Sequence, residues 1–523
     1  MQIVTPEFHQ MAQNGLIPID WDFMASFPKN FDDSITFFIL DSSLLDGGDI
    51  LSPSEDNPIQ EWDYYDYTSY KGRVISLEWQ RELDFPYSVQ SSIADITLNN
   101  YDNFFSPHGG SIIAPYAIPK RPVRLYAGFR TVGVISQFVG LTQTSPVIDN
   151  QSKQASLNAL DFLSEMFDMK LTNTIAMQNV TTDVVLDAIF QQFGLSPSQY
   201  SLAVGRNRIP FLFFERGKNA GNAFRELMQS EMGKLWLDEQ GIIRFEQRLQ
   251  GSETPVMTFD NGNIISISDT GDNEIINTVR IRSNIRAVQS FQPIFTNAQP
   301  EGQAVSLDSA FRIAASSSAF YPDATLEDPA LTAAPPTLGR KSDNSWFTAF
   351  DDSGNPVTSG ITPGLFVLNN GSVTLVLNNT NAFPVYIDQM EIWGEPAKIV
   401  DTINYEALDD VSVENYGEQP LEIENDFFGS LSNCDSFAEF VLDSYADNAG
   451  VIEMQVKGDP SLQLGDVITV DSNDYDHSYK IISTAARLEK FSLQYTIKAR
   501  RYTPRNWFIL DQSLLNSTDV LAP

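Results

Sequence analysis

Cysteine and histidine are scarce in this sequence, and their scarcity excludes several kinds of site. The single cysteine, Cys434, rules out an intrachain disulfide. Because Cys434 precedes an apolar helical pattern and has no histidine near it in the sequence, we expect a buried free thiol rather than a nucleophile. The three histidines, His9, His108 and His477, form no pair with metal-ligand spacing, so we expect no zinc site.

The short motifs of common enzymes are also missing. The sequence contains no G-x-S-x-G, P-loop or G-x-G-x-x-G pattern, and nothing in it points to a Ser-His-Asp triad. Acidic runs such as EDNPIQEWDYYD are more typical of a solvated surface than of a catalytic pair of carboxylates. The run DSNDYDH, residues 471–477, lacks the Gly and the terminal Glu of an EF-hand loop, which favours a polar turn over a calcium site. We therefore expect no enzyme and no cofactor.

Long apolar runs and a basic leader are absent too. The segment MQIVTPEFHQ has no basic stretch followed by an apolar core, so no signal peptide is expected. No apolar run approaches the roughly 20 residues that span a bilayer. The sequence therefore predicts a protein that is made in the cytoplasm and is not inserted in a membrane.

Positive charge is in short supply. The 33 Lys and Arg residues are outnumbered by 68 Asp and Glu residues, which gives a net charge of −35. Such a surface repels nucleic acid phosphates and anionic membranes, and this excludes a sequence-reading DNA-binding protein. Acidic walls are nevertheless compatible with a channel through which DNA slides without being held, so DNA is expected only in transit.

The apolar residues that are present fall into short β patterns and a few helical ones. The chain has 523 residues, of which 42% are hydrophobic, and this length predicts about three to four domains. Segments such as YKGRVISLEWQREL and SSIADITLNNY alternate as strands do, whereas helical spacing follows Thr181, Asn219 and Asp435. The predicted fold class is α+β, mainly β, with two small β-barrel domains, an intervening helix-plus-hairpin domain and an inserted β module.

The patterns divide the chain into seven segments. Strands, then helices, then a helix and strands again suggest two barrel halves, although the residues of the halves do not repeat convincingly. The predicted segments are an extended N-terminal arm (1–60), a first β-barrel (61–168), a helical α+β domain (169–255), strands joining the second barrel (256–290), an inserted β-rich module (291–404), a second barrel with a helix (405–505) and a C-terminal docking segment (506–523).

One internal repeat lies outside the predicted domains. FFILDSSLLDGGDILSP, residues 37–53, superposes without a gap on WFILDQSLLNSTDVLAP, residues 507–523. A single apolar strand is not stable alone, so each copy is expected either to add to a partner's sheet edge or to pack on this same chain as an edge strand. The candidate partner-binding residues are Phe38, Ile39, Leu40, Leu44 and Leu45 in the first copy and Phe508, Ile509, Leu510, Leu514 and Leu515 in the second.

The only compact basic cluster consists of Lys120, Arg121 and Arg124. Two interpretations are open. The cluster is either a face that pairs with carboxylates of the same chain or one half of a contact between subunits. In so acidic a protein, pairing with carboxylates is the favoured interpretation in both cases.

Several motifs together resemble the hub proteins of bacteriophage tails. SSIADITLNNYDNFFSP, KRPVRLYAGF and VGLTQTSPVID are similar to the first barrel of that family, and AFRELMQSEMGKLWLDEQGIIRFEQR is similar to its helix and hairpin. YGEQPLEIENDFF and the segment from FAEFVLDSYADN to LQLGDVITV are similar to its C-terminal part. The matching residues are Leu98, Asn100, Asp102, Phe105 and Pro107; Arg121, Val123, Arg124 and Leu125; Phe138 and Gly140; and Leu464, Gly465 and Asp466.

The resemblance covers most of residues 70–505 and implies a structural protein of the tail tip in the virion. It implies a homotrimer whose two barrels per chain match a six-fold tail tube, close it, and open for DNA on host contact. The implied partners are the distal tail or tail tube ring, the tape measure protein and a fibre or receptor-binding protein. The sequence departs from the family in its repeated segments and carries no appended lytic domain. The alternative function is a carbohydrate-binding or carbohydrate-cleaving tail adhesin.

Overall fold

Strands dominate the structure, a computed structural model, which confirms the predicted α+β, mainly β class. In the part of the chain that the structure describes, no helix is long and apolar enough to cross a membrane. The described residues are Gln2, Val4, Thr5, Phe8, 19–26, 68–83, 89–248, 254–270, 275–297, 310–339, 344–446, 450–457, 459–472, 475–489 and 492–502.

The N-terminal lobe is a sheet in the order β3-β4-β8-β6-β5-β1-β2, with β7 beside β8. β1 lies within the predicted N-terminal arm and pairs with β5 along its whole length, with the buried Phe23 and Ala25 on one face and Asp22 and Met24 on the other. The strands are β1 (Ile19–Ala25), β2 (Thr68–Ser69), β3 (Val74–Leu83), β4 (Gln90–Asn99), β5 (Pro122–Phe129), β6 (Gly133–Thr142), β7 (Val147–Asp149) and β8 (Gln154–Asp161), and the short 3-10 helices are η2 (Lys71–Arg73) and η3 (Ala114–Tyr116).

The helical unit follows the N-terminal lobe and has its own hydrophobic cluster. Its helix α4 begins after Asn219, as predicted, because the Asn219 side chain accepts the Asn222 N–H at 3.0 Å, and it ends at Glu231, before the left-handed Met232. Gly233 is required there because a Cβ would overlap the carbonyl oxygen of Glu246. The elements are α2 (Phe162–Met166), β9 (Ile175–Thr181), α3 (Thr182–Gln192), β10 (Tyr200–Leu202), β11 (Arg208–Phe214), α4 (Ala220–Glu231), β12 (Lys234–Leu237) and β13 (Ile243–Glu246).

The C-terminal lobe combines two strands that follow the helical unit with four from the end of the chain. β15 pairs with β27, which pairs with β30, while β14 runs parallel to β28. These strands are β14 (Met257–Asp260), β15 (Ile264–Asp269), β27 (Val451–Lys457), β28 (Val467–Asp471), β29 (His477–Glu489) and β30 (Ser492–Arg501).

β3 and β29 join the two lobes. They pair antiparallel, from Ser483 opposite Glu82 to Glu489 opposite Ser76. The strands of both lobes therefore belong to one 14-stranded sheet, and no closed barrel is found among the described residues. A single hydrophobic cluster runs through both lobes, so neither lobe has a core of its own.

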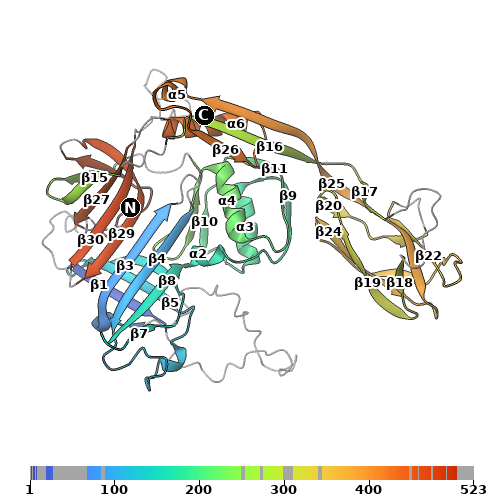
Figure 1. Ribbon diagram of the computed structural model, residues 1–523, viewed down its shortest axis with the longest axis horizontal. Helices are drawn as coiled ribbons and strands as arrows, with labels where there is room; N and C mark the ends of the chain where they lie inside the picture. The colour runs from blue at the N-terminus through green and yellow to red at the C-terminus, as the bar shows by residue number, and fades with distance from the viewer. Residues whose placement is uncertain are drawn as a thin grey trace.

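A long two-stranded ribbon of β16 (Thr278–Val288) and β25 (Val385–Leu408) leads away from the lobes (Figure 1). At the base of the ribbon, β16 pairs with β26 (Pro420–Glu424), and β25 leads into α5 (Asp410–Tyr416). The helix α6 (Leu431–Tyr445) covers one face of this base. The helix that the sequence placed after Asp435 begins earlier, because the Ser430 hydroxyl accepts the Asn433 N–H at 3.2 Å and caps it. Further along, residues 398–402 of β25 are exposed on both faces.

The ribbon ends in a distal module with a separate hydrophobic cluster (Figure 1). The first part of β25 is its central strand and pairs with four of its strands, while β19, β24 and β23 form a second sheet. Its strands are β17 (Gln292–Thr296), β18 (Phe311–Ile313), β19 (Ser317–Thr325), β20 (Ala330–Ala333), β21 (Thr337–Leu338), β22 (Trp346–Phe350), β23 (Ile361–Leu368) and β24 (Ser372–Asn379).

Candidate functional site: the buried junction of the lobes

Three units of the molecule meet at the side chain of Glu239, in a cluster that we call the junction. Glu239 lies in the turn between β12 and β13 of the helical unit, and one of its carboxylate oxygens pairs with Arg81 on β3 of the N-terminal lobe. Its other oxygen accepts a hydrogen bond from the side-chain amide of Gln463, which precedes β28 in the C-terminal lobe. The Arg81 and Glu239 side chains are only 7% and 4% exposed. A buried ion pair is stable only when the remaining lone pairs are satisfied, and Gln463 satisfies the second oxygen.

Neighbouring hydrogen bonds tie the same three units together. The Ser136 hydroxyl on β6 donates to the main-chain oxygen of Glu239. The Gln137 amide donates to the Pro460 carbonyl at 2.9 Å, and the Tyr495 hydroxyl on β30 donates to the Gln137 side-chain oxygen at 2.9 Å. Burial raises the pKa of Tyr495 far above its usual value. The hydroxyl therefore keeps its proton and remains a donor across the lobes.

Gln2 also lies in the junction. Its main-chain N–H donates to the Ser461 carbonyl at 2.8 Å, and its side-chain amide donates to the Ser136 carbonyl at 3.0 Å. Gln2 is buried, so these bonds replace contacts with water. One residue near the beginning of the chain thus bridges the two lobes.

A second set of contacts fixes the helical unit to the base of the ribbon. The Asn207 amide donates to the Phe427 carbonyl at 2.9 Å, and the Asn433 amide on α6 donates to the Asn207 side-chain oxygen at 3.0 Å. The fully buried Glu231 accepts the Asn207 N–H at 3.0 Å and the Thr182 hydroxyl at 2.9 Å. These donors hold Glu231 in place, which indicates a structural carboxylate rather than a reactive one.

The C-terminal lobe contacts α6 through an aromatic side chain. The guanidinium carbon of Arg500 on β30 lies 4.5 Å from the centre of the Tyr445 ring, which is a cation–π contact. Burial lowers the pKa of Arg500 to about 10 and raises the pKa of Tyr445 to about 12. At neutral pH both groups keep their protons, so the contact is between a cation and a neutral ring.

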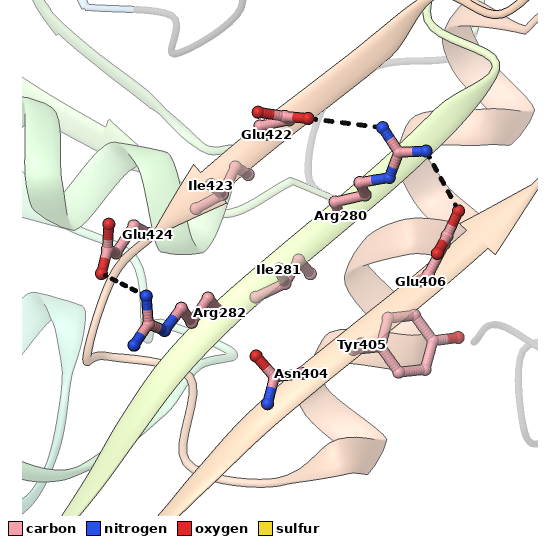
Figure 2. A pocket seen from close by; sticks show the side chains of 9 residues that line it. All are labelled: Arg280, Ile281, Arg282, Asn404, Tyr405, Glu406, Glu422, Ile423 and Glu424. Carbon is pink, nitrogen blue, oxygen red and sulfur yellow. Dashed lines mark hydrogen bonds and ion pairs between the residues drawn. The ribbon is translucent and has the colours of Figure 1, made fainter.

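The outer face of the ribbon base carries an open groove lined by charged side chains (Figure 2). Arg280 on β16 donates to Glu406 of β25 at 3.3 Å and to Glu422 of β26 at 3.3 Å, and Arg282 lies 3.5 Å from Glu424. All of these side chains are exposed by more than a third, and exposed pairs of this kind contribute little to stability. The groove is a sheet face on which charged side chains of neighbouring strands pair with one another.

The structure places the predicted basic cluster at the start of β5. Lys120 forms an ion pair with Glu165 of α2, within the same chain. Arg121 and Arg124 are half-buried in the N-terminal lobe, and Arg124 lies opposite Met24 and Val139 on the neighbouring strands. A contact between subunits through this cluster stays a prediction.

The remaining predicted residues divide into two groups. Cys434 is a buried free thiol on α6, as predicted, and burial raises its pKa to about 11. Both copies of the repeat, with all ten candidate partner-binding residues, lie outside the described residues. Among the residues that the structure does describe, no group of three His, Cys, Asp or Glu side chains could hold a metal ion.

Arg81 and Glu239 were missed by the sequence reasoning. In WQREL, Arg81 occupies the position where an alternating strand continues its buried face after Trp79, and this was the available signal. Glu239 lies in the segment DEQG, whose composition is typical of a solvated turn, and nothing in the neighbouring sequence indicates that its side chain is buried. Its partner is 158 residues away in the sequence, which no local pattern can reveal.

Solved structures similar to this one include phage and prophage tail proteins and a component of a type VI secretion system. No protein-family model and no curated protein matches the sequence. A 43 kDa tail protein of prophage MuSo2 from Shewanella oneidensis has 11% identity and a TM-score of 0.44, covering 83% of this chain and 96% of its own. A tail protein from Neisseria meningitidis MC58 has 9% identity and a TM-score of 0.44, covering 83% and 94%. Prophage tail protein gp18 from Listeria monocytogenes EGD-e has 10% identity and a TM-score of 0.40, covering 84% and 92%.

Proposed function

We propose that this chain is the structural hub of a bacteriophage tail tip. It assembles as a homotrimer in which the two lobes of each chain occupy two of six positions below the six-fold tube, closes the tail tube, and opens for DNA on host contact. Its partners are the tube or distal tail ring, the tape measure protein and a fibre or receptor-binding protein. The opening step is a change in how subunits pack, without bond chemistry.

The observation that carries the proposal is the union of two strand-rich lobes in one continuous sheet. The β3–β29 pairing and the junction around Glu239 hold the lobes in a fixed relation. Three chains with two lobes each supply six lobes, which is the number that a six-fold tube requires. The net charge of −35 also suits a wall along which DNA slides, because such a wall repels phosphates.

Electron microscopy and mass photometry of the purified full chain test the proposal. Three-fold particles with a central channel, at three times the chain mass of 58.4 kDa, are the expected result. A monomer that persists at micromolar concentration would overturn the proposal. Release of sugars from host envelopes by the purified chain would favour the adhesin instead.

A further inference from the structure

The distal module touches the helical unit as well as the ribbon. The turn between β23 and β24, residues 369–371, lies against the start of β9 and against β11. The Thr174 hydroxyl donates to the Asn369 carbonyl at 3.0 Å, and a Cβ on Gly371 would lie 2.9 Å from the Phe213 ring. In Figure 1, β20 and β24 lie on the side of the distal module that faces β9. We call this contact of four residues the latch.

The turn that reaches the helical unit is held in shape by its own module. Asn370 has a left-handed backbone with a φ of 58°, and its side-chain amide donates to the Ala330 carbonyl at 2.7 Å. The Ala330 N–H donates back to the Asn370 carbonyl at 2.6 Å, and the Leu326 N–H donates to the Gly371 carbonyl at 3.0 Å. These bonds lie within the distal module, so the turn keeps its shape when the latch opens.

The surface that receives the turn is held in the same way by the helical unit. Phe213 on β11 lies opposite Ala176 on β9, and the two strands pair along their length. The neighbouring Phe214 and Ile175 are buried in the hydrophobic cluster of the helical unit, whereas Phe213 is half-buried. Neither side of the latch therefore has to unfold for the latch to open.

The latch is a weak contact between two stable parts. It consists of one neutral hydrogen bond and the packing of Gly371 on one ring, and a hydrogen bond of this kind contributes little net stability. The helical unit is held more firmly to the ribbon base, where the buried Asn207 forms hydrogen bonds with both Phe427 and Asn433. A displacement of the distal module would therefore break the latch and leave the base in place.

The ribbon that carries the distal module has an irregular point along its length. The pairing of β16 with β25 shifts register between Ile285 and Arg286, which leaves Val400 of β25 as a β-bulge. A bulge interrupts the ladder of hydrogen bonds and bends the strand. Residues 398–402 are exposed on both faces and belong neither to the cluster of the ribbon base nor to that of the distal module. The ribbon therefore has its least support at the bulge.

The two sides of the bulge belong to different bodies. Beyond it, Arg286 forms an ion pair with Asp328 at 3.2 Å and donates to the Ala397 carbonyl at 3.0 Å, so it is fixed to the distal module. Before it, Ile285 and Ile403 pack in the hydrophobic cluster of the ribbon base. The bulge thus marks the boundary at which one body can turn relative to the other.

We propose that the distal module is a movable arm, which the latch holds against the helical unit and which swings about the bulge at Val400 when the latch opens. The latch and the hinge are properties of the chain and do not depend on its assembly. Their role in the hub rests on the proposed function: a force on the arm opens the latch before it disturbs the buried junction around Glu239. The arm then gives the hub a mechanical response to host contact.

Gly371 offers a substitution that opens the latch selectively. The three atoms nearest to a Cβ at this position all belong to the Phe213 ring, so a side chain there meets the helical unit first. We expect Gly371→Leu to push the turn away from β11 and to open the latch. Adding Phe213→Ala removes the obstacle and should let the latch close again.

Pulsed electron paramagnetic resonance of the purified full chain measures the position of the arm. Spin labels on cysteines that replace the exposed Gln191 of α3 and Ser353 of the distal module report on the latch. Labels at Gln191 and at the exposed Glu414 of α5 report on the ribbon base. Wild type should give one narrow Gln191–Ser353 distance distribution, and Gly371→Leu should shift and broaden it. The variant that also carries Phe213→Ala should return to the wild-type distribution, and the Gln191–Glu414 distribution should stay the same throughout.

Two threonines provide a matched pair of further variants. Thr174→Val removes the hydrogen bond of the latch and should broaden the Gln191–Ser353 distribution less than Gly371→Leu does. Thr172→Val removes a hydroxyl that bonds to Gln192 within the helical unit, and it should leave the distribution unchanged. Hydrogen exchange in residues 310–339 and 344–397 should also stay unchanged in Gly371→Leu, because the arm moves as one folded body.

Four results would overturn the inference. They are an unchanged Gln191–Ser353 distribution in Gly371→Leu, a broad distribution already in wild type, a shift of the Gln191–Glu414 distance, and faster hydrogen exchange throughout the distal module of Gly371→Leu. A chain that stays monomeric but passes these tests refutes only the proposed function, whereas a trimer that fails them refutes only this inference.

Discussion

Arg81 and Glu239 form a buried ion pair across 158 residues of sequence, between the strand that joins the lobes and a turn of the helical unit. Arg81 lies opposite Thr484 in the β3–β29 pairing, so the same residue takes part in the sheet that unites the lobes. A charge pair that is shared by three units makes their separation costly, because separation would leave charges without partners.

Removal of one member of this pair should destabilise the whole body. We expect Arg81→Ala to lower the free energy of unfolding by about 3–5 kcal/mol, because the Glu239 carboxylate is then buried without its cation. Arg81→Met combined with Glu239→Leu should recover most of the loss. Denaturant unfolding followed by tryptophan fluorescence measures both.

The matched control is the exposed pair of Arg487 and Glu78, which joins the same two strands at 3.1 Å with side chains 58% and 45% exposed. Arg487→Ala should cost at most about 1 kcal/mol. An Arg81→Ala variant with the same free energy of unfolding as Arg487→Ala would contradict the assignment. A double variant that is less stable than Arg81→Ala would also contradict it.

Asp161 should make stability depend on pH in an unusual direction. Burial raises its pKa above the ordinary 3.8, so the folded state binds this proton more tightly than the unfolded state. The stability that the protonated carboxyl contributes is therefore lost as the pH rises from about 4 through the raised pKa. Asp161→Asn keeps the acceptor that caps α2 at 2.6 Å from the Ser164 nitrogen and removes the charge. We expect its stability relative to wild type to grow with pH over that window and then to level off.

Asp149 provides the opposite case, and urea unfolding at a series of pH values measures both variants. The Ser152 hydroxyl, 2.6 Å away, and nearby main-chain N–H groups lower the pKa of this exposed carboxyl. Asp149→Asn should therefore lose stability relative to wild type above pH 4, and the loss should vanish as the pH falls through the lowered pKa. If the stability differences of both variants from wild type changed with pH in the same direction, burial would not be the cause of the pKa shift of Asp161.

Cys434 should be unreactive in the folded protein. With a pKa of about 11, about one thiol in a thousand is ionised at pH 8, and the side chain is buried on α6. We expect the reaction of the native chain with a disulfide reagent to be slower than that of the denatured chain by at least about a hundredfold. Comparable rates in the two states would mean that α6 opens readily from the ribbon base.

A substitution in the distal module should lower the stability of that module and leave the stability of the lobes unchanged. Gly394 lies on β25, where a Cβ would overlap the main-chain oxygen of Thr332 on β20. Gly394→Ala should therefore destabilise the distal module by about 1–3 kcal/mol. Hydrogen exchange should rise in residues 310–339 and 344–397 and stay unchanged in the lobes. Gly72→Ala, where a Cβ meets nothing within 4 Å, is the control, and faster exchange in the lobes as well would contradict the separation.

Local patterns predicted the start of α4 because a cap is local, whereas α6 begins at Leu431, before the predicted Asp435. Asn219 and Asp161 mark the starts of α4 and α2 through hydrogen bonds to residues three positions ahead. The strand β1 was overlooked within the predicted arm, although Ile19, Trp21 and Phe23 alternate, because one short alternating run among prolines and glycines is a weak signal. On β3, Ile75 is exposed because the pairing with β4 shifts register between Val74 and Ser76, and such an irregularity leaves no trace in composition.

Long-range pairing could not be predicted in the same way. The partner of Leu77 across the lobes is Leu488, and neither residue differs from any other buried leucine in a strand. The junction was hidden for the same reason, since Gln463, Gln137 and Tyr495 acquire their roles only when distant strands meet. The repeat was visible in the sequence because identity between two segments does not depend on folding.

β25 has 24 residues and runs without interruption from the centre of the distal module to the base beside α6. At about 3.4 Å per residue, its backbone is about 80 Å long. A force that pulls on the distal module along the ribbon therefore acts on the continuous backbone of β25 and on its main-chain hydrogen bonds to β16. At its base the strand lies beside α6, whose last residue, Tyr445, contacts Arg500 of the C-terminal lobe, so the distal module is connected to that lobe through the base of the ribbon.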